Sequence, residues 1–240
     1  MYYIPQGEAV VEYFKKSRDL DGNAMNLVGL HSFGCPPDDI KRFGADASGG
    51  HVRPAPGFEH LDNKDRIWYT QHRDFHSLLT GASLDAMTTK FVEVFSRRVK
   101  TTSRVRGTEW IEMPDFYTFL RDELFCATTQ ALCGDHFFEV NPDFNDLFWD
   151  MDRGMLPILR RLPRWMAAKS YGDRDRALAA VAEWHRVSNE RFDWDDKEQV
   201  AADWEPVFGA RLMRARQRMF KDLGTSTRSH ASMDLGMMWA

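Results

Sequence analysis

The chain has 240 residues, a formal net charge of −4 and 28% charged residues. A balance this close to neutral creates no global field that would favour nucleic acid or an anionic membrane. Because 43% of the residues are hydrophobic and 13% aromatic, the composition argues against intrinsic disorder and predicts a globular protein.

The N-terminal sequence MYYIPQGEAVVEYFKK begins with a short β-prone run at residues 2–4 and a turn at residues 5–7. A helix is predicted from Glu8 onward, with Val10, Val11 and Phe14 on one face. The segment lacks the positive region and apolar core of a signal peptide, and no later window reaches the ~18 apolar residues of a membrane span. We therefore expect a chain without a membrane span, located in the cytoplasm.

Residues 20–60 are dense in Gly, Pro, Asp and Ser, which predicts a long loop with short helical pieces. A loop of this length is usually functional or flexible. Helical periodicity then returns and predicts two helices, over residues 65–75 and 84–99.

The middle of the chain carries clear helix start and stop signals. Pro114 suits the first turn of a helix, apolar residues follow at helical spacing through residues 116–131, and Gly134 ends the pattern. Asn141 can cap another helix, with Pro142 at its first position. Pro157 and Pro163 then bracket a basic break, ILRRLPRW.

Residues 173–192 read as the clearest amphipathic helix, with Leu178, Val181, Trp184 and Val187 facing inward. The acidic run at residues 193–196 ends it.

Pro206 is expected to start another helix, one that presents four basic residues to solvent: Arg211, Arg214, Arg218 and Lys221. The final segment MDLGMMWA has no Gly or Asn cap and no basic last turn, so we expect a helix that is cut partway. The predicted fold class is mainly α with minor β.

The chain has three cysteines, Cys35, Cys126 and Cys133. An odd number suits a reducing compartment, and we expect all three to be structural thiols. Cys126 and Cys133 lie two helical turns apart, about 10 Å of rise, which is too far for a disulfide. With His136 they place three soft ligands within eleven residues, but zinc normally takes four at tighter paired spacings. No metal site is expected.

Asp74, His76 and Ser77 contain the residue types of a hydrolase triad, yet neighbours on one helix point in different directions. No G-x-S-x-G elbow and no phosphate-binding glycine loop occurs. No catalytic residue is therefore assigned.

The basic cluster Arg160, Arg161, Arg164 and Lys169 has three interpretations, which the sequence leaves open. It can bind an acidic partner, bind lipid headgroups, or form a solvated face beside a proline turn.

Three consecutive segments carry a more specific pattern: PDFYTFLRDELFCATTQALCG, NPDFNDLFWDMDRGMLPILRRLPRW and YGDRDRALAAVAEWHR. They resemble the middle of a cytochrome P-450, a haem-thiolate monooxygenase, of the fungal type. The resemblance covers nearly the whole chain. It implies that residues 1–240 form a single partial domain, the N-terminal half of the family fold, ending early in the long central helix and before the haem-ligand loop.

In this resemblance, residues 66–79 correspond to the helix that runs under the haem, where the family supplies a basic partner for a haem propionate. His76 falls near that place, and His72 is a rival one turn earlier. A basic partner for a partly buried carboxylate is physically sensible. A surface or packing role for His76 is the alternative.

The family's iron is held by a cysteine on a loop of the form F-x-x-G-x-x-x-C, and the family also carries an E-x-x-R pair; neither is present here. The resemblance implies a monooxygenase of secondary metabolism that oxidises a small lipophilic substrate with electrons from NADPH-cytochrome reductase. Most eukaryotic members are anchored to the endoplasmic reticulum, and we expect this chain to lack that anchor. We expect a truncated, inactive form that binds haem weakly or not at all.

The alternative function is a non-enzymatic helical module that binds an apolar ligand or a protein partner. In that hypothesis the segment MDLGMMWA is an exposed docking surface.

Overall fold

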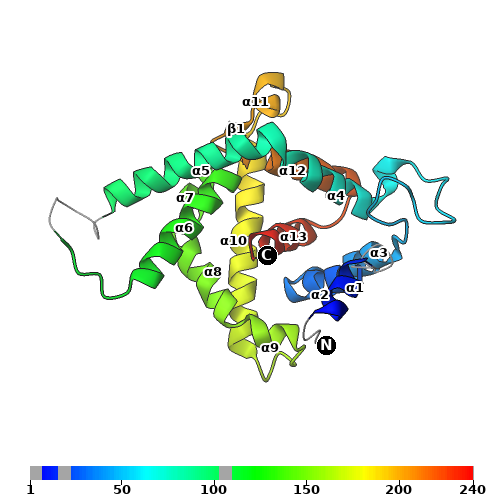
Figure 1. Ribbon diagram of the computed structural model, residues 1–240, viewed down its shortest axis with the longest axis horizontal. Helices are drawn as coiled ribbons and strands as arrows, with labels where there is room; N and C mark the ends of the chain where they lie inside the picture. The colour runs from blue at the N-terminus through cyan, green and yellow to red at the C-terminus, as the bar shows by residue number, and fades with distance from the viewer. Residues whose placement is uncertain (1–6, 16–22, 103–109, 240) are drawn as a thin grey trace.

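The structure is a computed structural model that describes residues 7–15, 23–102 and 110–239 (Figure 1). Within these ranges the chain is mainly helical, as predicted, and its strands form one two-stranded hairpin. The β-prone run at residues 2–4 lies outside the described residues. The β structure that is described lies near the other end of the chain.

The helices and strands follow one another in three groups. The first group is α1 (Glu8–Lys15), α2 (Asn23–Ser32), α3 (Pro37–Ala45), the 3-10 turn η2 (Asn63–Asp65), α4 (Ile67–Leu78) and α5 (Gly81–Thr101). The second is α6 (Phe116–Cys133), α7 (His136–Val140), α8 (Phe144–Arg153), α9 (Met155–Leu159) and α10 (Ala168–Arg191). The third is α11 (Lys197–Ala201), β1 (Trp204–Glu205), β2 (Gly209–Ala210), α12 (Arg211–Leu223) and α13 (Thr227–Trp239).

The predicted long loop at residues 20–60 is only partly a loop, because α2 and α3 occupy much of it. Pro37 stands at the first position of α3, and Asp38 and Asp39 in its first turn complement the helix dipole. Phe43 on α3 is fully buried. The density of Gly and Pro therefore concealed a helix whose N-terminus the same Pro and Asp residues favour.

The predictions for α4, α5 and α6 are confirmed, with a correction at the start of α6. Pro114 does not occupy the first turn; instead Asp115 caps the helix, and its carboxylate accepts a hydrogen bond from the amide of Thr118 at 2.9 Å. Gly134 ends α6 as predicted, with a φ of 89°.

Asn141 does not cap a helix N-terminus, which corrects the prediction for this segment. Its side-chain amide donates to the carbonyl of Ala180 at 3.0 Å and so links α7 to α10. The following helix, α8, begins only at Phe144. The short helices α7, α9 and α11 were not predicted, because five residues are too few to show a helical period.

Helix α10 runs through the centre of the molecule, and α13 lies beside it (Figure 1). The predicted inward residues Leu178, Val181 and Trp184 are buried, whereas Val187 is only partly buried. The Trp184 ring meets that of Phe137 at 5.1 Å between centroids. Burying a large apolar side chain stabilises the fold by about 1.5–3 kcal/mol, so the buried rings of Trp184 and Phe137 stabilise the packing of α10 against α7.

The segment around Pro206 is a hairpin and not the start of a helix. Glu205 organises it, because its carboxylate accepts from the amides of Val207 and Phe208 at 2.8 and 2.5 Å. Helix α12 begins after the hairpin. Arg214 is 1% exposed and donates to the carbonyls of Gly209 and Ala202 beneath the hairpin, so the expectation that it faces solvent is wrong.

The hairpin approaches the end of α6 so closely that two glycines are required. A Cβ on Gly209 would lie 2.3 Å from the amide nitrogen of Gly134, and Gly209 has a φ of 68°. We predict that Gly209→Ala lowers the free energy of unfolding by about 2–3 kcal/mol, because steric overlap adds to the left-handed strain. Urea unfolding measures the change.

Gly224→Ala is the matched control for this prediction. Gly224 has a φ of 58°, but a Cβ there would have nothing within 4 Å. Gly224→Ala should lower the free energy of unfolding by only about 1 kcal/mol, because it adds left-handed backbone strain without steric overlap. Equal losses for the two variants would contradict the steric account.

Helix α13 is packed against the core, which corrects the expectation that the segment MDLGMMWA is exposed. Ala231 and Leu235 are fully buried, and residues 237–239 are half-buried. The indole nitrogen of Trp239 donates to the carboxylate of Asp152 at 2.9 Å, and its ring lies 5.6 Å from that of Phe33.

Candidate functional site

Helix α4 is the element on which three cavities meet. Trp68 and Phe75 face an apolar cavity, Tyr69 and His76 face a second cavity, and Leu78 faces a third. Residues spaced by 3.6 positions share one helix face, so each cavity receives its own stripe of α4.

Arg66, directly before α4, fixes the loop of residues 46–62 against this helix. It is fully buried, and its guanidinium donates to the carbonyls of Ser48, Gly49, His51 and Val52 at 2.5–3.3 Å. Carbonyl oxygens of a loop need partners when they are buried, and one guanidinium offers five N–H donors.

Asp46 completes the attachment of this loop. Its carboxylate accepts from the amide of Trp68 in the first turn of α4 at 3.2 Å and from the amide of Ser48 at 3.0 Å. A carboxylate at a helix N-terminus is stabilising. The loop therefore has a fixed position over α4 despite its composition.

The apolar cavity lies between α2, α4 and α13 and has a volume of about 410 Å³. Its walls include the rings of Phe33, Trp68, Phe75 and Trp239. Gly236 lets α13 pass close to α2, because a Cβ there would lie 3.0 Å from the Phe33 ring. A cavity of this size and lining suits a lipophilic small molecule.

The histidine cavity, on the adjacent face of α4, has a volume of about 260 Å³ and brings together His51, His72 and His76. Nδ1 of His72 is 2.9 Å from the carbonyl of Gly50 and donates to it. The rings of His51 and His72 meet edge to face with centroids 6.1 Å apart. His76 is exposed at this cavity. Imidazoles together with the neighbouring Arg73 can bind a carboxylate.

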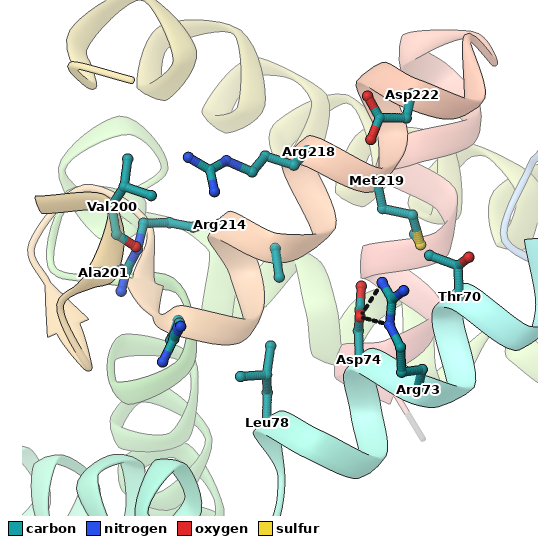
Figure 2. A pocket seen from close by; sticks show the side chains of 12 residues that line it. Thr70, Arg73, Asp74, Leu78, Val200, Ala201, Arg214, Arg218, Met219 and Asp222 are labelled. Carbon is teal, nitrogen blue, oxygen red and sulfur yellow. Dashed lines mark hydrogen bonds and ion pairs between the residues drawn. The ribbon is translucent and has the colours of Figure 1, made fainter. Parts of the chain in front are cut away.

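The third cavity lies between α4, α11 and α12, has a volume of about 410 Å³ and is lined by four arginines. Figure 2 shows Arg73 paired with Asp74 on α4, and Arg218 and Asp222 projecting from α12. Arg214 is engaged with Glu205 at 3.4 Å and with carbonyls of the hairpin. Two of the four guanidinium groups are thus neutralised by the chain's own acids.

The hydrolase triad is not assembled. Asp74 lines the third cavity, whereas His76 and Ser77 line the histidine cavity. The hydroxyl of Ser77 donates to the backbone carbonyl of Asp74 at 3.3 Å. A nucleophile, a base and an acid that face two cavities cannot act as one relay.

The cysteines are buried thiols. Burial raises the pKa of Cys35, raises that of Cys126 to about 11, and raises that of Cys133 well above its usual value. The Cys35 sulfur lies 3.3 Å from the hydroxyl oxygen of Ser229. None of the three lines a cavity described above, so none presents a thiolate to a bound molecule.

Cys126, Cys133 and His136 do not come together. Cys126 contacts the side-chain oxygen of Asn145 at 3.8 Å, and Nδ1 of His136 lies 2.8 Å from the carboxylate of Glu139. Over the described ranges, no three His, Cys, Asp or Glu side chains are arranged to hold a metal ion.

The basic cluster is partly neutralised by α10. Arg164 pairs with Asp175 at 2.8 Å, and Lys169 pairs with Asp173 at 2.7 Å. Arg160 and Arg161 are exposed, and Arg161 has a φ of 55°. No helix in the described part of the chain has both the length and the apolar character to cross a bilayer.

Sequence reasoning found His72 and His76 but missed Arg66, Asp46 and a buried charge network centred on Asp234. Asp234 accepts from Arg216 at 2.5 Å and lies 2.8 Å from Nε2 of His185. The signal that could have found it is a lone acid in an otherwise apolar final segment.

Comparison with known proteins gives one consistent relationship. The chain is 25% identical over 242 residues to the cytochrome P450 monooxygenase efuG of Hormonema carpetanum, a match that covers 99% of this chain and 40% of that protein. It is 26% identical to the cytochrome P450 monooxygenase fsoE of Humicola fuscoatra, with 99% and 39% covered. It is 28% identical to the cytochrome P450 monooxygenase calL of Penicillium decumbens, with 88% and 39% covered.

No protein-family model matches the chain, and no solved structure matches it. The chain spans about two fifths of the length of the curated relatives that it matches. The mainly helical fold agrees with a partial fold of that family. The chain is thus similar to fungal cytochrome P450 monooxygenases along nearly its whole length.

Proposed function

We propose that residues 1–240 form one partial cytochrome P450 domain, which contributes substrate-pocket and haem-edge surfaces to a monooxygenase. The observation that carries the proposal is the juxtaposition of an apolar cavity and a histidine cavity on adjacent faces of α4. A haem has an apolar macrocycle and two carboxylates, so it requires both kinds of surface.

The residues of this chain fit the propionate edge of a haem. His76, with Arg73 beside it, offers N–H donors to a propionate. The described residues do not fit the iron, because all three cysteines are buried thiols with raised pKa values. A thiolate ligand supplies the electron density that favours cleavage of the O–O bond. We therefore propose that this stretch by itself does not activate oxygen.

The complete enzyme, in this proposal, oxidises a small lipophilic substrate held at the apolar cavity. Its electrons come from NADPH-cytochrome reductase. The lining of Phe33, Phe75 and Trp239 favours a substrate without charge.

A second candidate function is the binding of an apolar ligand without chemistry. The cavity of about 410 Å³ beside α13 favours it. Saturable binding of a neutral apolar ligand to the haem-free chain, with no haem binding under the same conditions, would select this candidate.

Haem titration of the purified chain tests the role of His76. We expect His76→Leu to raise the dissociation constant for haem about tenfold, the value of one charge-assisted hydrogen bond. His60→Leu, an exposed histidine of the preceding loop, is the matched control and should change nothing. Unchanged affinity in His76→Leu, or an equal loss in His60→Leu, would remove His76 from the site.

A further inference from the structure

One cavity lies between the C-terminal half of α10, the 193–195 turn, α12 and the start of α13. We propose that it binds a small aromatic oxyanion, in which a planar ring carries a phosphate or a carboxylate. Its volume is about 560 Å³, larger than the three cavities on α4. It is separate from the histidine and apolar cavities of the proposed monooxygenase site.

The first support is unbalanced positive charge. Arg218 and Lys221 lie one helical turn apart on α12, both are exposed, and both line the cavity. Neither forms an ion pair with any carboxylate of the described residues. Asp195 is the one acid among the lining residues. Two cations at the mouth of one cavity favour an anion.

The second support is a buried amide with an unused donor. Gln217 lines the cavity and is 8% exposed. Its Oε1 accepts from the side-chain nitrogen of Asn189 at 3.1 Å, which fixes the orientation of the amide. Its Nε2 has no hydrogen-bond partner among the described residues. Buried donors are normally paired, so in this proposal an acceptor oxygen of the ligand completes the hydrogen bonding of the Gln217 amide.

The third support is an aromatic wall. The rings of Phe220 and His230 stack with centroids 4.5 Å apart and planes 4° apart. Burial, together with the nearby His185, lowers the pKa of His230 to about 4, so the ring is neutral at pH 7. Trp194 adds a second aromatic surface, with the Arg218 guanidinium 5.8 Å from its ring centre. Flat neutral rings beside two cations suit a planar anion.

Isothermal titration calorimetry on the full chain tests the proposal with four probes. Adenosine 5′-monophosphate carries a ring and a phosphate, 1-naphthoate a ring and a carboxylate, adenosine the ring alone, and inorganic phosphate the anion alone. We expect at least one of the first two to bind saturably and at least tenfold more tightly than adenosine and phosphate. Which of the two binds more tightly distinguishes phosphate from carboxylate.

Variants locate the binding. Arg218→Gln with Lys221→Gln should weaken it at least tenfold, and Gln217→Met should weaken it several-fold. Arg211→Gln removes an exposed arginine of the same helix that lies outside this cavity, and it should leave affinity unchanged. Circular dichroism verifies that each variant is folded. No saturable binding by the two ring-bearing anions, or binding indifferent to the double substitution, would overturn the proposal.

Discussion

Asp234→Ala is expected to lower the free energy of unfolding by about 3–5 kcal/mol, because it leaves a buried arginine without its carboxylate. Asp234 is fully buried, and Arg216, 2% exposed, donates to it at 2.5 Å. His185 on α10 contacts the other carboxylate oxygen at 2.8 Å. The three side chains join α10, α12 and α13, so their loss should weaken the packing of all three helices. Urea unfolding followed by circular dichroism measures the change.

Two variants make this result specific. Glu183→Ala removes an exposed acid of α10 that pairs with Arg186 at 2.6 Å, and it should cost less than about 1 kcal/mol. The double variant Asp234→Leu with Arg216→Met removes both charges and should be more stable than Asp234→Ala. A loss in Asp234→Ala no larger than in Glu183→Ala would contradict the role of the network.

The pH dependence of this stabilisation has a defined sign. Burial alone would raise the pKa of Asp234, but Arg216 and His185 outweigh it, and the pKa lies below its usual value. A carboxylate with a depressed folded pKa contributes stability above its unfolded pKa of about 3.9 and loses it as pH falls through the folded value. The difference between wild type and Asp234→Ala should therefore hold from pH 7 to about pH 5 and shrink below about pH 4.

Arg66→Met is expected to lower the free energy of unfolding by about 3 kcal/mol and to release the loop of residues 46–62. Methionine keeps an apolar stem but removes every donor that holds the carbonyls of Ser48, Gly49, His51 and Val52. Each buried carbonyl that loses its partner costs about 1–3 kcal/mol unless water reaches it. Release of the loop exposes these carbonyls to water, so the total loss of stability stays at about 3 kcal/mol. Limited proteolysis should cut this loop faster in the variant.

Arg53→Met is the matched control, because Arg53 is an exposed arginine of the same loop. It should change neither the stability nor the cleavage rate. Equal protease resistance of Arg66→Met and wild type would show that the loop is held by other contacts.

Much of the helical framework follows from local patterns in the sequence. Apolar spacing alone located α4, α5, α6 and most of α10, because each buries one face against the core. The predictions that Pro206 starts a helix and that Arg214 faces solvent were wrong for the same reason, because both residues belong to the hairpin and its surroundings. Glu205 organises this hairpin, and Gly209 packs it against Gly134, which lies 75 residues earlier in the chain. No local window contains that contact.

The candidate site was predictable only in part. His72 and His76 were found because residues 66–79 resemble the helix that runs under the haem in the cytochrome P-450 family. Arg66 does not stand out, because its partners are backbone carbonyls, which every residue has. The apolar cavity joins residues as distant as Phe33 and Trp239, and only the folded chain brings them together.

The most direct test of the account is the absorption spectrum of the haem-loaded chain, reduced under carbon monoxide. A thiolate ligand shifts the Soret band of this complex to distinctly longer wavelength than a nitrogen or water ligand. With all three cysteines buried and their pKa values raised, we predict a spectrum without the thiolate band. A thiolate-type band in stoichiometric proportion to bound haem would contradict the account.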